Sequence, residues 1–269
     1  MTELLQYNFF VNALISAVLA SISCGIVGTY IVTKRMVFIS GGISHASFGG
    51  IGIAHFLGIN PIAGAGIFSV LSGLIIGKYV HQKSIRPDSV IGILWSLGMA
   101  TGIIFIYLTP GYSPNLMSYL FGNILTVTLP ELYAMSVLTV VIILFFLYYF
   151  RSILYISFDE EFAQTRKLSV RFINMTLLSL ISLTIVLNIR IVGIILVISL
   201  LTIPQTIANI FSKNFNKIIL LSILISFAGT ISGLYISYWL NIPSGATIIF
   251  MLAFGYLISH LFYQFSKRS

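Results

Sequence analysis

Long stretches without a charged side chain make up most of this 269-residue chain, and short groups of basic residues separate them. A helix needs about 20 apolar residues to cross the hydrocarbon core of a bilayer, and each stretch is close to that length or longer. The uncharged stretches cover residues 4–33, 36–77, 89–130, 132–150, 172–189, 191–212 and 218–266. The pattern therefore predicts an all-α membrane protein that crosses the bilayer many times.

Turn-forming residues predict where the longest stretches are interrupted. They are Asn60-Pro61, Pro110-Gly111 and the sequence Asn-Ile-Pro-Ser-Gly at 241–245. The predicted spans are roughly 9–33, 39–58, 61–80, 90–109, 130–150, 171–188, 191–211, 216–239 and 245–264. The result is one transmembrane domain over residues 1–269, a bundle of eight or nine helices, with the lower number if 191–211 is re-entrant. A short apolar segment within 115–128 is expected on the outer surface, or to re-enter the membrane.

Composition excludes a soluble protein. Charged residues make up 7% of the chain and hydrophobic residues 58%, whereas soluble domains usually carry about 25% charged residues. The formal net charge of +8 would suggest nucleic-acid binding in a soluble chain, but here the basic residues lie at predicted helix ends. They indicate orientation and affinity for anionic membrane lipid rather than for nucleic acid. The single cysteine, Cys24, excludes an intrachain disulfide and a thiolate metal site.

The basic residues also predict how the chain is oriented, because cytoplasmic loops retain Lys and Arg. The clusters are Lys34/Arg35, Lys78/Lys83/Arg86, Arg151, Arg166/Lys167/Arg171, Lys213/Lys217 and Lys267/Arg268. Placing them inside puts the N-terminus outside and the C-terminus in the cytosol. Arg190 is the exception, since it falls in a predicted tight turn on the outer side.

Few ionisable residues lie inside the predicted spans, and this limits the available chemistry. None of the six acidic residues is central to a span, whereas a proton- or sodium-coupled carrier usually needs a carboxylate there. His45 is the informative candidate, because it lies in a glycine- and serine-rich span and imidazole is the commonest metal-ligating side chain. It could also simply hydrogen-bond a backbone carbonyl. One histidine cannot hold a metal ion, but two copies across a two-fold axis, with water or hydroxyl oxygens, could.

Small residues recur every four positions along the span that holds His45. They are Gly42, Ala46, Gly50 and Ala54. Such spacing lets two helix backbones approach closely in lipid, so these residues are expected to serve helix packing.

The longest polar stretch is 157–168, which the charge pattern places in the cytosol. Ser157 followed by Glu160 forms a capping-box pattern, and Arg166 and Lys167 at the other end complement the helix dipole. We expect a short surface helix parallel to the membrane, with Phe158 and Phe162 available for docking. It either rests among lipid headgroups or serves as a contact surface for a cytosolic partner protein. Its three acidic residues favour the partner, because anionic headgroups would repel them.

Five segments, spread over nearly the whole chain, match one set of sequence signatures. The most extensive is Lys-Arg-Met-Val-Phe-Ile-Ser-Gly-Gly-Ile-Ser-His-Ala-Ser-Phe-Gly-Gly at 34–50, which is similar to the pattern Arg-Arg-Met-x-x-x-Gly-Asp-x-x-x-His-Ala. The others are Phe121-Gly122-Asn123-Ile124-Leu125, Phe158-Asp159-Glu160-Glu161-Phe162-Ala163, 192–204 and Pro243-Ser244-Gly245-Ala246-Thr247. In this order and at this spacing they resemble the permease subunits of metal-ion ABC importers, which take up zinc, manganese or iron(II).

The resemblance implies a homodimeric permease in the plasma membrane of a prokaryote. It would be bound to two cytosolic ATPase subunits and supplied by an extracytoplasmic metal-binding protein. The permease itself would be no enzyme and would hold no permanent cofactor, and the ion would pass between the two copies by alternating access. Segment 157–168 would be the coupling helix. Its ATPase-coupling residues would be Phe158, Asp159, Glu160, Glu161, Phe162 and Ala163.

His45 falls on the family's pore histidine, with one departure nearby. Many members carry Asp at the position of Gly41, so a His-only gate is left here unless another residue compensates. The candidate helpers are Ser40, Ser44, Ser47 and His55. Imidazole favours Zn²⁺ whereas a carboxylate suits Mn²⁺, so loss of the acid favours zinc over manganese or iron. The alternatives are a stand-alone secondary transporter or channel for small cations, and a membrane scaffold or sensor without transport.

Overall fold

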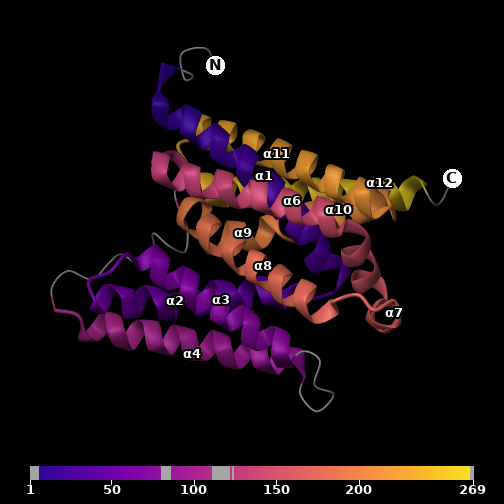
Figure 1. Cartoon of the computed structure of the whole chain (residues 1–269). Helices are drawn as coiled ribbons and strands as arrows, with labels where there is room; N and C mark the ends of the chain where they lie inside the picture. Colours follow the sequence, from indigo (N-terminus) through magenta and orange to yellow (C-terminus); the bar gives the residue numbers. More distant parts are fainter. Residues whose placement is uncertain (1–5, 80–85, 111–121, 123, 267–269) are drawn as a thin grey trace.

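The computed structural model describes residues 6–79, 86–110, 122 and 124–266, and this part of the chain contains helices and no strands. The helices are α1 (Asn8–Thr33), α2 (Phe38–Phe56), α3 (Pro61–Tyr79), α4 (Pro87–Leu108), the short 3₁₀-helix η2 (Ile124–Thr126), α6 (Leu129–Phe158), α7 (Glu160–Thr165), α8 (Val170–Val192), α9 (Ile194–Leu200), α10 (Ile203–Phe211), α11 (Phe215–Leu240) and α12 (Ser244–Ser266). Most of the long helices run in roughly one common direction (Figure 1), which confirms the predicted all-α transmembrane bundle.

Eight helical segments of the described part are long and apolar enough to cross a membrane. That set counts α9 and α10 as one segment, Ile194–Phe211, and does not include α2. α2 has 19 residues, as α3 does, and lies beside α3 and α4 in Figure 1; its glycine, serine and histidine residues lower its hydropathy. Counting α2 as a span would give eight plus one, or nine, crossings among the described helices, and the choice between eight and nine stays a prediction. The start of α1 and the end of α12 lie at opposite ends of the bundle in Figure 1.

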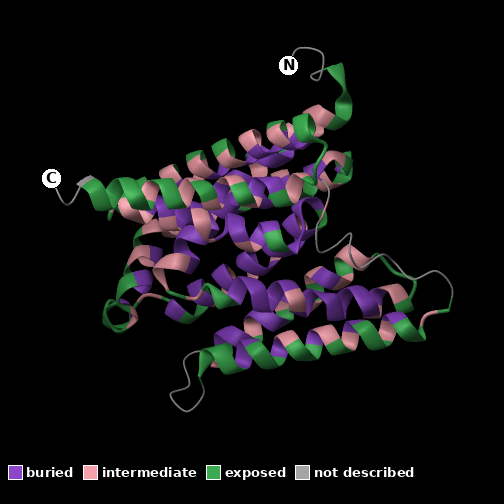
Figure 2. Cartoon of the chain, turned by 180° about the vertical axis from the view of Figure 1, so that it is seen from behind, coloured by how far each residue is buried: buried purple, intermediate pink, exposed green. Residues whose placement is uncertain are grey.

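α8 lies at the centre of the bundle, between two groups of helices. α2, α3 and α4 pack together on one side, and α1, α6, α11 and α12 lie on the other (Figure 1). Among the candidate spans α8 is the most buried and α12 the least (Figure 2). Large apolar side chains such as Val137, Leu147 and Phe254 are exposed on the outside. This distribution fits a bundle whose outer surface contacts lipid tails instead of water.

Close backbone contacts hold α2 against α3 and α4. The four small residues predicted to serve packing lie at these crossings: Gly42 faces Ile91, Ala46 faces Gly98, and Gly50 and Ala54 face Gly64. A Cβ added to Gly98 would lie 2.5 Å from the Cα of Ala46, closer than real side-chain carbons approach one another. The helices can pack at this distance only because glycine has no side chain.

The segment predicted over 191–211 is a broken helix, with a two-residue gap between α9 and α10. The buried Gln205 spans the break: its Nε2 donates to the carbonyl oxygens of Leu200 (3.0 Å) and of Cys24 in α1 (2.9 Å). Non-helical backbone is tolerated at membrane depth where protein groups satisfy its carbonyls, as Gln205 does here.

The structure corrects the expected tight turn at Arg190. α8 continues to Val192, and the turn falls at Gly193, whose φ of +81° favours glycine. Arg190 instead donates from Nε to Oε1 of Glu131, at the start of α6, over 3.1 Å. Arg190 and Glu131 thus neutralise one another at this end of the bundle. Which end faces the cytosol stays a prediction.

The polar helix also differs from its predicted range of 157–168. Ser157 continues α6 and donates to the carbonyl of Ile153 at 2.6 Å, so it does not cap a new helix. Asp159 is the cap, since its backbone is extended and its Oδ1 accepts the N–H of Phe162 at 2.9 Å. The helix ends by Thr165, and Lys167 takes a φ of +57°. The polar surface helix is therefore α7 alone, a turn shorter at its start than expected.

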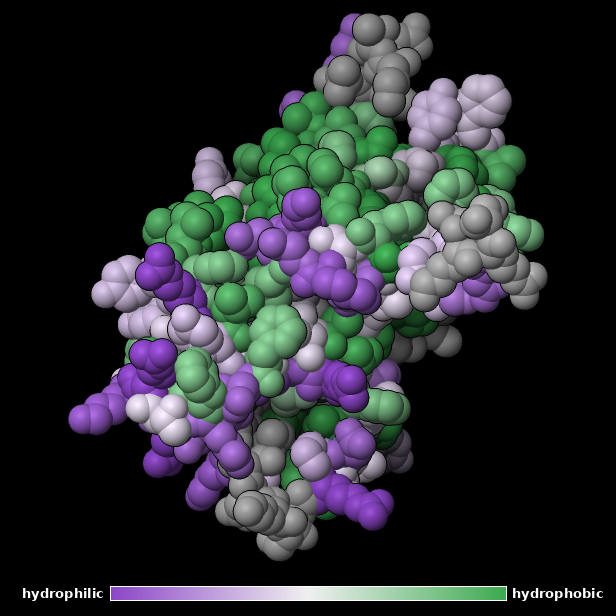
Figure 3. Space-filling model, turned by 90° about the vertical axis from the view of Figure 1, so that its right-hand side faces the viewer, coloured by the Kyte–Doolittle hydropathy of each residue, from purple (hydrophilic) through white to green (hydrophobic). Residues whose placement is uncertain are grey.

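Several of the predicted cytosolic ends meet around α7. Lys34 at the end of α1, Gly77 of α3 and Asn174 of α8 line one small pocket together with Glu160. This end of the molecule faces the viewer in Figure 3, and hydrophilic side chains gather on it. The grouping agrees with the charge pattern, which requires these helix ends to share one side of the membrane.

Candidate functional site

His45 of α2 is half-buried and stacks flat on Trp95 of α4. The two ring centroids lie 4.2 Å apart and the ring planes differ by 5°. Phe48 lies further off, with its ring centroid 6.4 Å from that of His45. The buried Nδ1 of His45 has no hydrogen-bond partner among the described residues, so this nitrogen does not bond a backbone carbonyl there. The imidazole is thus oriented by ring stacking with Nδ1 unpartnered among the described residues, and a ring nitrogen binds a metal ion in the ring plane.

The serine helpers do not lie with the imidazole. Ser44 donates to the carbonyl of Ser40 and Ser47 to that of Ser44, each over 2.6 Å, and both side chains are buried. Ser47 lines a small pocket with Ala65 of α3 and Ile189 of α8. A residue two positions along a helix does not face its neighbour, so Ser47 and His45 lie on different sides of α2. The structure therefore brings neither serine hydroxyl into one ligand group with His45.

His55 is also separated from His45. Ten residues of helix correspond to about 15 Å along the axis, whereas a Zn–N bond measures about 2 Å. His55 and His45 of one chain thus cannot bind the same ion. Within the described residues no three His, Cys, Asp or Glu side chains come together as a metal-ligating group. The described part of one copy therefore does not assemble a metal site of three such residues.

Gly41 lies one turn before His45, next to the same tryptophan. A Cβ at this position would lie 3.5 Å from Cζ3 of Trp95 and 3.9 Å from Cδ1 of Ile198 in α9, which are ordinary contact distances. Gly42, in contrast, would overlap with Ile91. Packing therefore demands glycine at 42 but leaves space for a side chain at 41.

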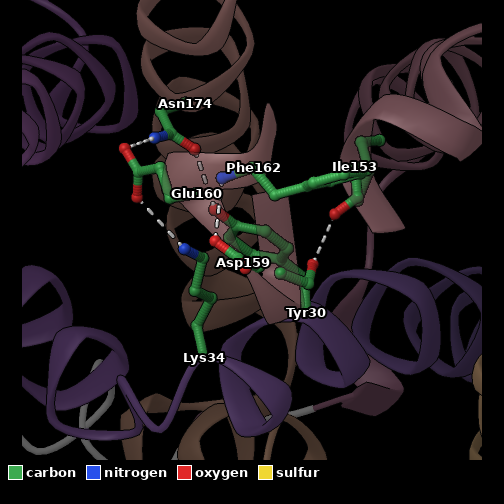
Figure 4. A network of polar contacts seen from close by, with 8 residues as sticks. Tyr30, Lys34, Ile153, Asp159, Glu160, Phe162 and Asn174 are labelled. Carbon is green, nitrogen blue, oxygen red and sulfur yellow. Dashed lines mark hydrogen bonds and ion pairs between the residues drawn. The ribbon is translucent and has the colours of Figure 1, made fainter. Parts of the chain in front are cut away.

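α7 is tied to the body of the protein by a network of polar contacts (Figure 4). Glu160 accepts from Nζ of Lys34 through Oε2, at 3.3 Å, and from Nδ2 of Asn174 through Oε1, also at 3.3 Å. The hydroxyl of Tyr30 donates to Oδ1 of Asn174 at 3.1 Å. Ala163 is fully buried. Two of the six predicted ATPase-coupling residues, Glu160 and Ala163, thus face inward, and the network joins α7 to α1 and α8.

The exposed residues at this junction are a different set. Phe158, the last residue of α6, and Glu161 and Phe162 of α7 are exposed, while Asp159 is engaged as the helix cap. The ring of Phe162 has two neighbours: Tyr155 meets it edge-on with the centroids 5.6 Å apart, and the Arg166 guanidinium carbon lies 5.3 Å from its centroid. These three exposed residues form the surface that a cytosolic partner could contact.

At the end of the bundle opposite to α7, two of the five segments that match the permease signatures, 121–125 and 192–204, lie in contact at Gly122. Gly122, with a φ of +58°, packs against Val192 and Gly193 so tightly that a Cβ there would overlap with their backbone. Phe121 and Asn123 of the same signature, and most of the predicted 115–128 segment, lie outside the described residues.

The sequence did not predict the structural roles of three residues at the α7 network and beside His45. Lys34 was interpreted only as an orientation charge, and Trp95 and Asn174 were not identified. For Asn174 a signal existed, because a buried polar residue inside a span needs a partner. For Trp95 there was none, since stacking on His45 depends on how α2 and α4 cross.

Comparisons with known proteins agree with this architecture. The sequence profile described as the ABC 3 transport family matches residues 6–263. The chain is 42% identical to an uncharacterized membrane protein of Synechocystis, over 97% of this chain and 93% of that protein. It is 34% identical to the manganese transport system membrane protein MntC of Listeria innocua, over 96% of this chain and 92% of that one.

A solved structure is similar over nearly the whole fold. A chain of PsaBC from Streptococcus pneumoniae, determined in complex with Fab, superposes with a TM-score of 0.84 and 32% identity, covering 95% of this chain and 92% of that chain. Family profile, relatives and fold therefore agree, as the order of the sequence signatures predicted: this chain belongs to the ABC 3 transport family.

Proposed function

We propose that this chain is the transmembrane subunit of an ATP-driven importer for a divalent transition metal ion. The observation that carries the proposal is His45, a half-buried imidazole with an unpartnered nitrogen in a glycine-packed span of an ABC 3 family permease. The name of the Listeria relative, a manganese transport system membrane protein, supports a metal ion as cargo.

The ion passes between two copies of the chain and meets one His45 from each. The absence of a three-residue ligand group within the described part of one copy supports a site shared across a dimer. Few ligands suit transport, because an ion held by four good ligands would not leave. Alternating access then exposes the two imidazoles first to the outer side, where a metal-binding protein docks near the 241–245 turn, and afterwards to the cytosol.

The donor atoms favour zinc as the cargo. Imidazole without a carboxylate binds Zn²⁺ in preference to Mn²⁺, and the position one turn before His45 is Gly41 and not an acidic residue. The name of the Listeria relative favours manganese as the second candidate. Accumulation of both metals from an equimolar mixture distinguishes the two.

ATP hydrolysis occurs on separate subunits that contact the outward side of α7. The Glu160–Lys34 ion pair gives this helix a direct link to the end of α1. Lys34 is followed within four residues by α2, which carries His45. Movement of α7 therefore reaches the His45 helix through one ion pair and one short turn.

The test uses purified permease in liposomes, with and without the ATPase and the metal-binding protein. We expect metal to accumulate inside vesicles only when all three proteins and ATP are present, measured by mass spectrometry of the vesicle contents. Metal flux through the permease alone would instead establish the alternative class, a stand-alone secondary transporter or channel. Absence of flux with the full set of proteins would favour a scaffold or sensor.

A further inference from the structure

Trp95 covers one face of the His45 ring and also reaches the position one turn earlier on α2. Its indole stacks on the imidazole at 4.2 Å, and its Cζ3 would lie 3.5 Å from a Cβ at Gly41. The other atom nearest to that Cβ belongs to Ile198, at 3.9 Å. The atoms nearest to a side chain at position 41 are therefore carbons of Trp95 and Ile198, and the indole of Trp95 is shared with His45.

Stacking restricts how the imidazole can turn. A metal ion binds a ring nitrogen along its lone pair, which lies in the ring plane. A parallel indole at 4.2 Å blocks rotation of that plane, so the direction of the nitrogen lone pair becomes fixed. Outer residues that orient a metal-binding histidine usually do so by hydrogen bonds, and here the buried Nδ1 has none among the described residues. Stacking is the interaction that remains to orient His45.

The same indole influences which ions can bind. Mn²⁺ prefers oxygen ligands, including water, whereas Zn²⁺ accepts a site with imidazole nitrogen and few oxygens. The indole of Trp95 supplies no oxygen ligand and leaves less room for ion-bound water on the face of the His45 ring that it covers. We infer that Trp95 is a positioning and specificity-determining residue of the metal path, an inference that rests on the proposed function. It holds the imidazole plane and selects against ions that require oxygen ligands.

The experiment measures zinc and manganese accumulation from an equimolar mixture, in cells that carry the complete importer and lack other uptake systems for these metals. The same metal-binding protein supplies every variant, so a change in ratio reports on the permease. Trp95→Ala should lower the zinc-to-manganese ratio about tenfold, the size of effect seen when a residue orienting a metal ligand is removed. Trp95→Phe keeps an aromatic ring and should retain most of the ratio. Leu97→Ala, an exposed position on the same helix, is the matched control and should leave the ratio unchanged.

Gly41→Asp provides an independent variant that keeps the tryptophan. The space at this position admits a side chain, and a carboxylate one turn from His45 adds the oxygen that Mn²⁺ prefers. We expect the ratio to move toward manganese. If Trp95→Ala lowers both metals equally, or if Gly41→Asp leaves the ratio unchanged while the protein is present in the membrane, the inference is overturned.

His45→Ala separates this inference from the proposed function. If that variant imports both metals normally, the proposed path fails. If it imports neither, while the Trp95 and Gly41 variants keep the original ratio, the path stands and only the role of Trp95 is removed.

Discussion

The junction around α7 and the layer formed by α2, α3 and α4 are held together by different forces. At α7, side chains from three segments meet through an ion pair and directional hydrogen bonds. Within the layer, backbones touch at glycines, and the described serine hydroxyls of α2 donate only to carbonyls of their own segment. Directional polar contacts transmit a displacement, whereas close glycine contacts let helices shift without breaking a hydrogen bond. Under the proposed mechanism we therefore expect the α7 junction to transmit the movement and the α2 layer to shift.

The largest expected effect comes from filling the helix contact within the layer. At Gly50 even a Cβ would overlap with the carbonyl of Gly64, and overpacking of this kind costs about 1–3 kcal/mol or more. Gly50→Val should therefore prevent the permease from folding, measured as the monodisperse fraction in size-exclusion chromatography. Gly66→Val on α3 is the matched control, because a Cβ there meets nothing within 4 Å. Equal losses in both variants would show that valine itself, and not the close contact, is responsible.

A smaller effect is expected at the α7 junction. Glu160→Ala leaves the partly buried Lys34 without this carboxylate, and hydrogen bonds to charged groups contribute about 1.5–3 kcal/mol. The purified complex should melt at a lower temperature and import less metal per ATP hydrolysed, while the ATPase still co-purifies. The double variant Lys34→Ala/Glu160→Ala should lose less stability than the sum of the single variants, because each removes the same interaction. Strictly additive losses would show that the pair is not coupled.

Phe158, the last residue of α6 and two positions before Glu160, provides the contrast to Glu160. Phe158 is exposed, so Phe158→Asp should leave the melting temperature of the isolated permease unchanged and reduce the amount of ATPase that co-purifies. The opposite outcome, with Glu160 governing ATPase association and Phe158 governing stability, would contradict the division of this junction into an inward and an outward side.

The spans and the site helix could be predicted from sequence because each rests on a local pattern. Asn60-Pro61 and Pro243 mark turns regardless of how the helices pack against one another. Uncharged stretches of membrane-spanning length can likewise be recognised without knowledge of the tertiary structure. The small residues of α2 likewise indicated a close helix contact, although not which helix would face Gly50. The order of the signatures identified the family and, with it, His45.

The remaining features depend on how distant segments meet. Ser157 has the sequence of a cap, but α6 continues through it because Asp159 offers a better-placed carboxylate. Glu160 was expected to face a partner, and its direction follows from Lys34, 126 residues earlier. Trp95 stacks on His45 only because α4 crosses α2 at this point. Contacts between segments far apart in the chain, and not local propensity, decide these cases.

The most direct measurement compares His45→Ala with His55→Ala in vesicles that contain the complete importer. The two residues lie on the same helix, about 15 Å apart along its axis, so the pair controls for loss of an imidazole as such. We predict that His45→Ala abolishes ATP-dependent metal accumulation while dimer formation and ATPase association persist, and that His55→Ala retains accumulation. Normal accumulation by His45→Ala would contradict a metal path lined by this imidazole.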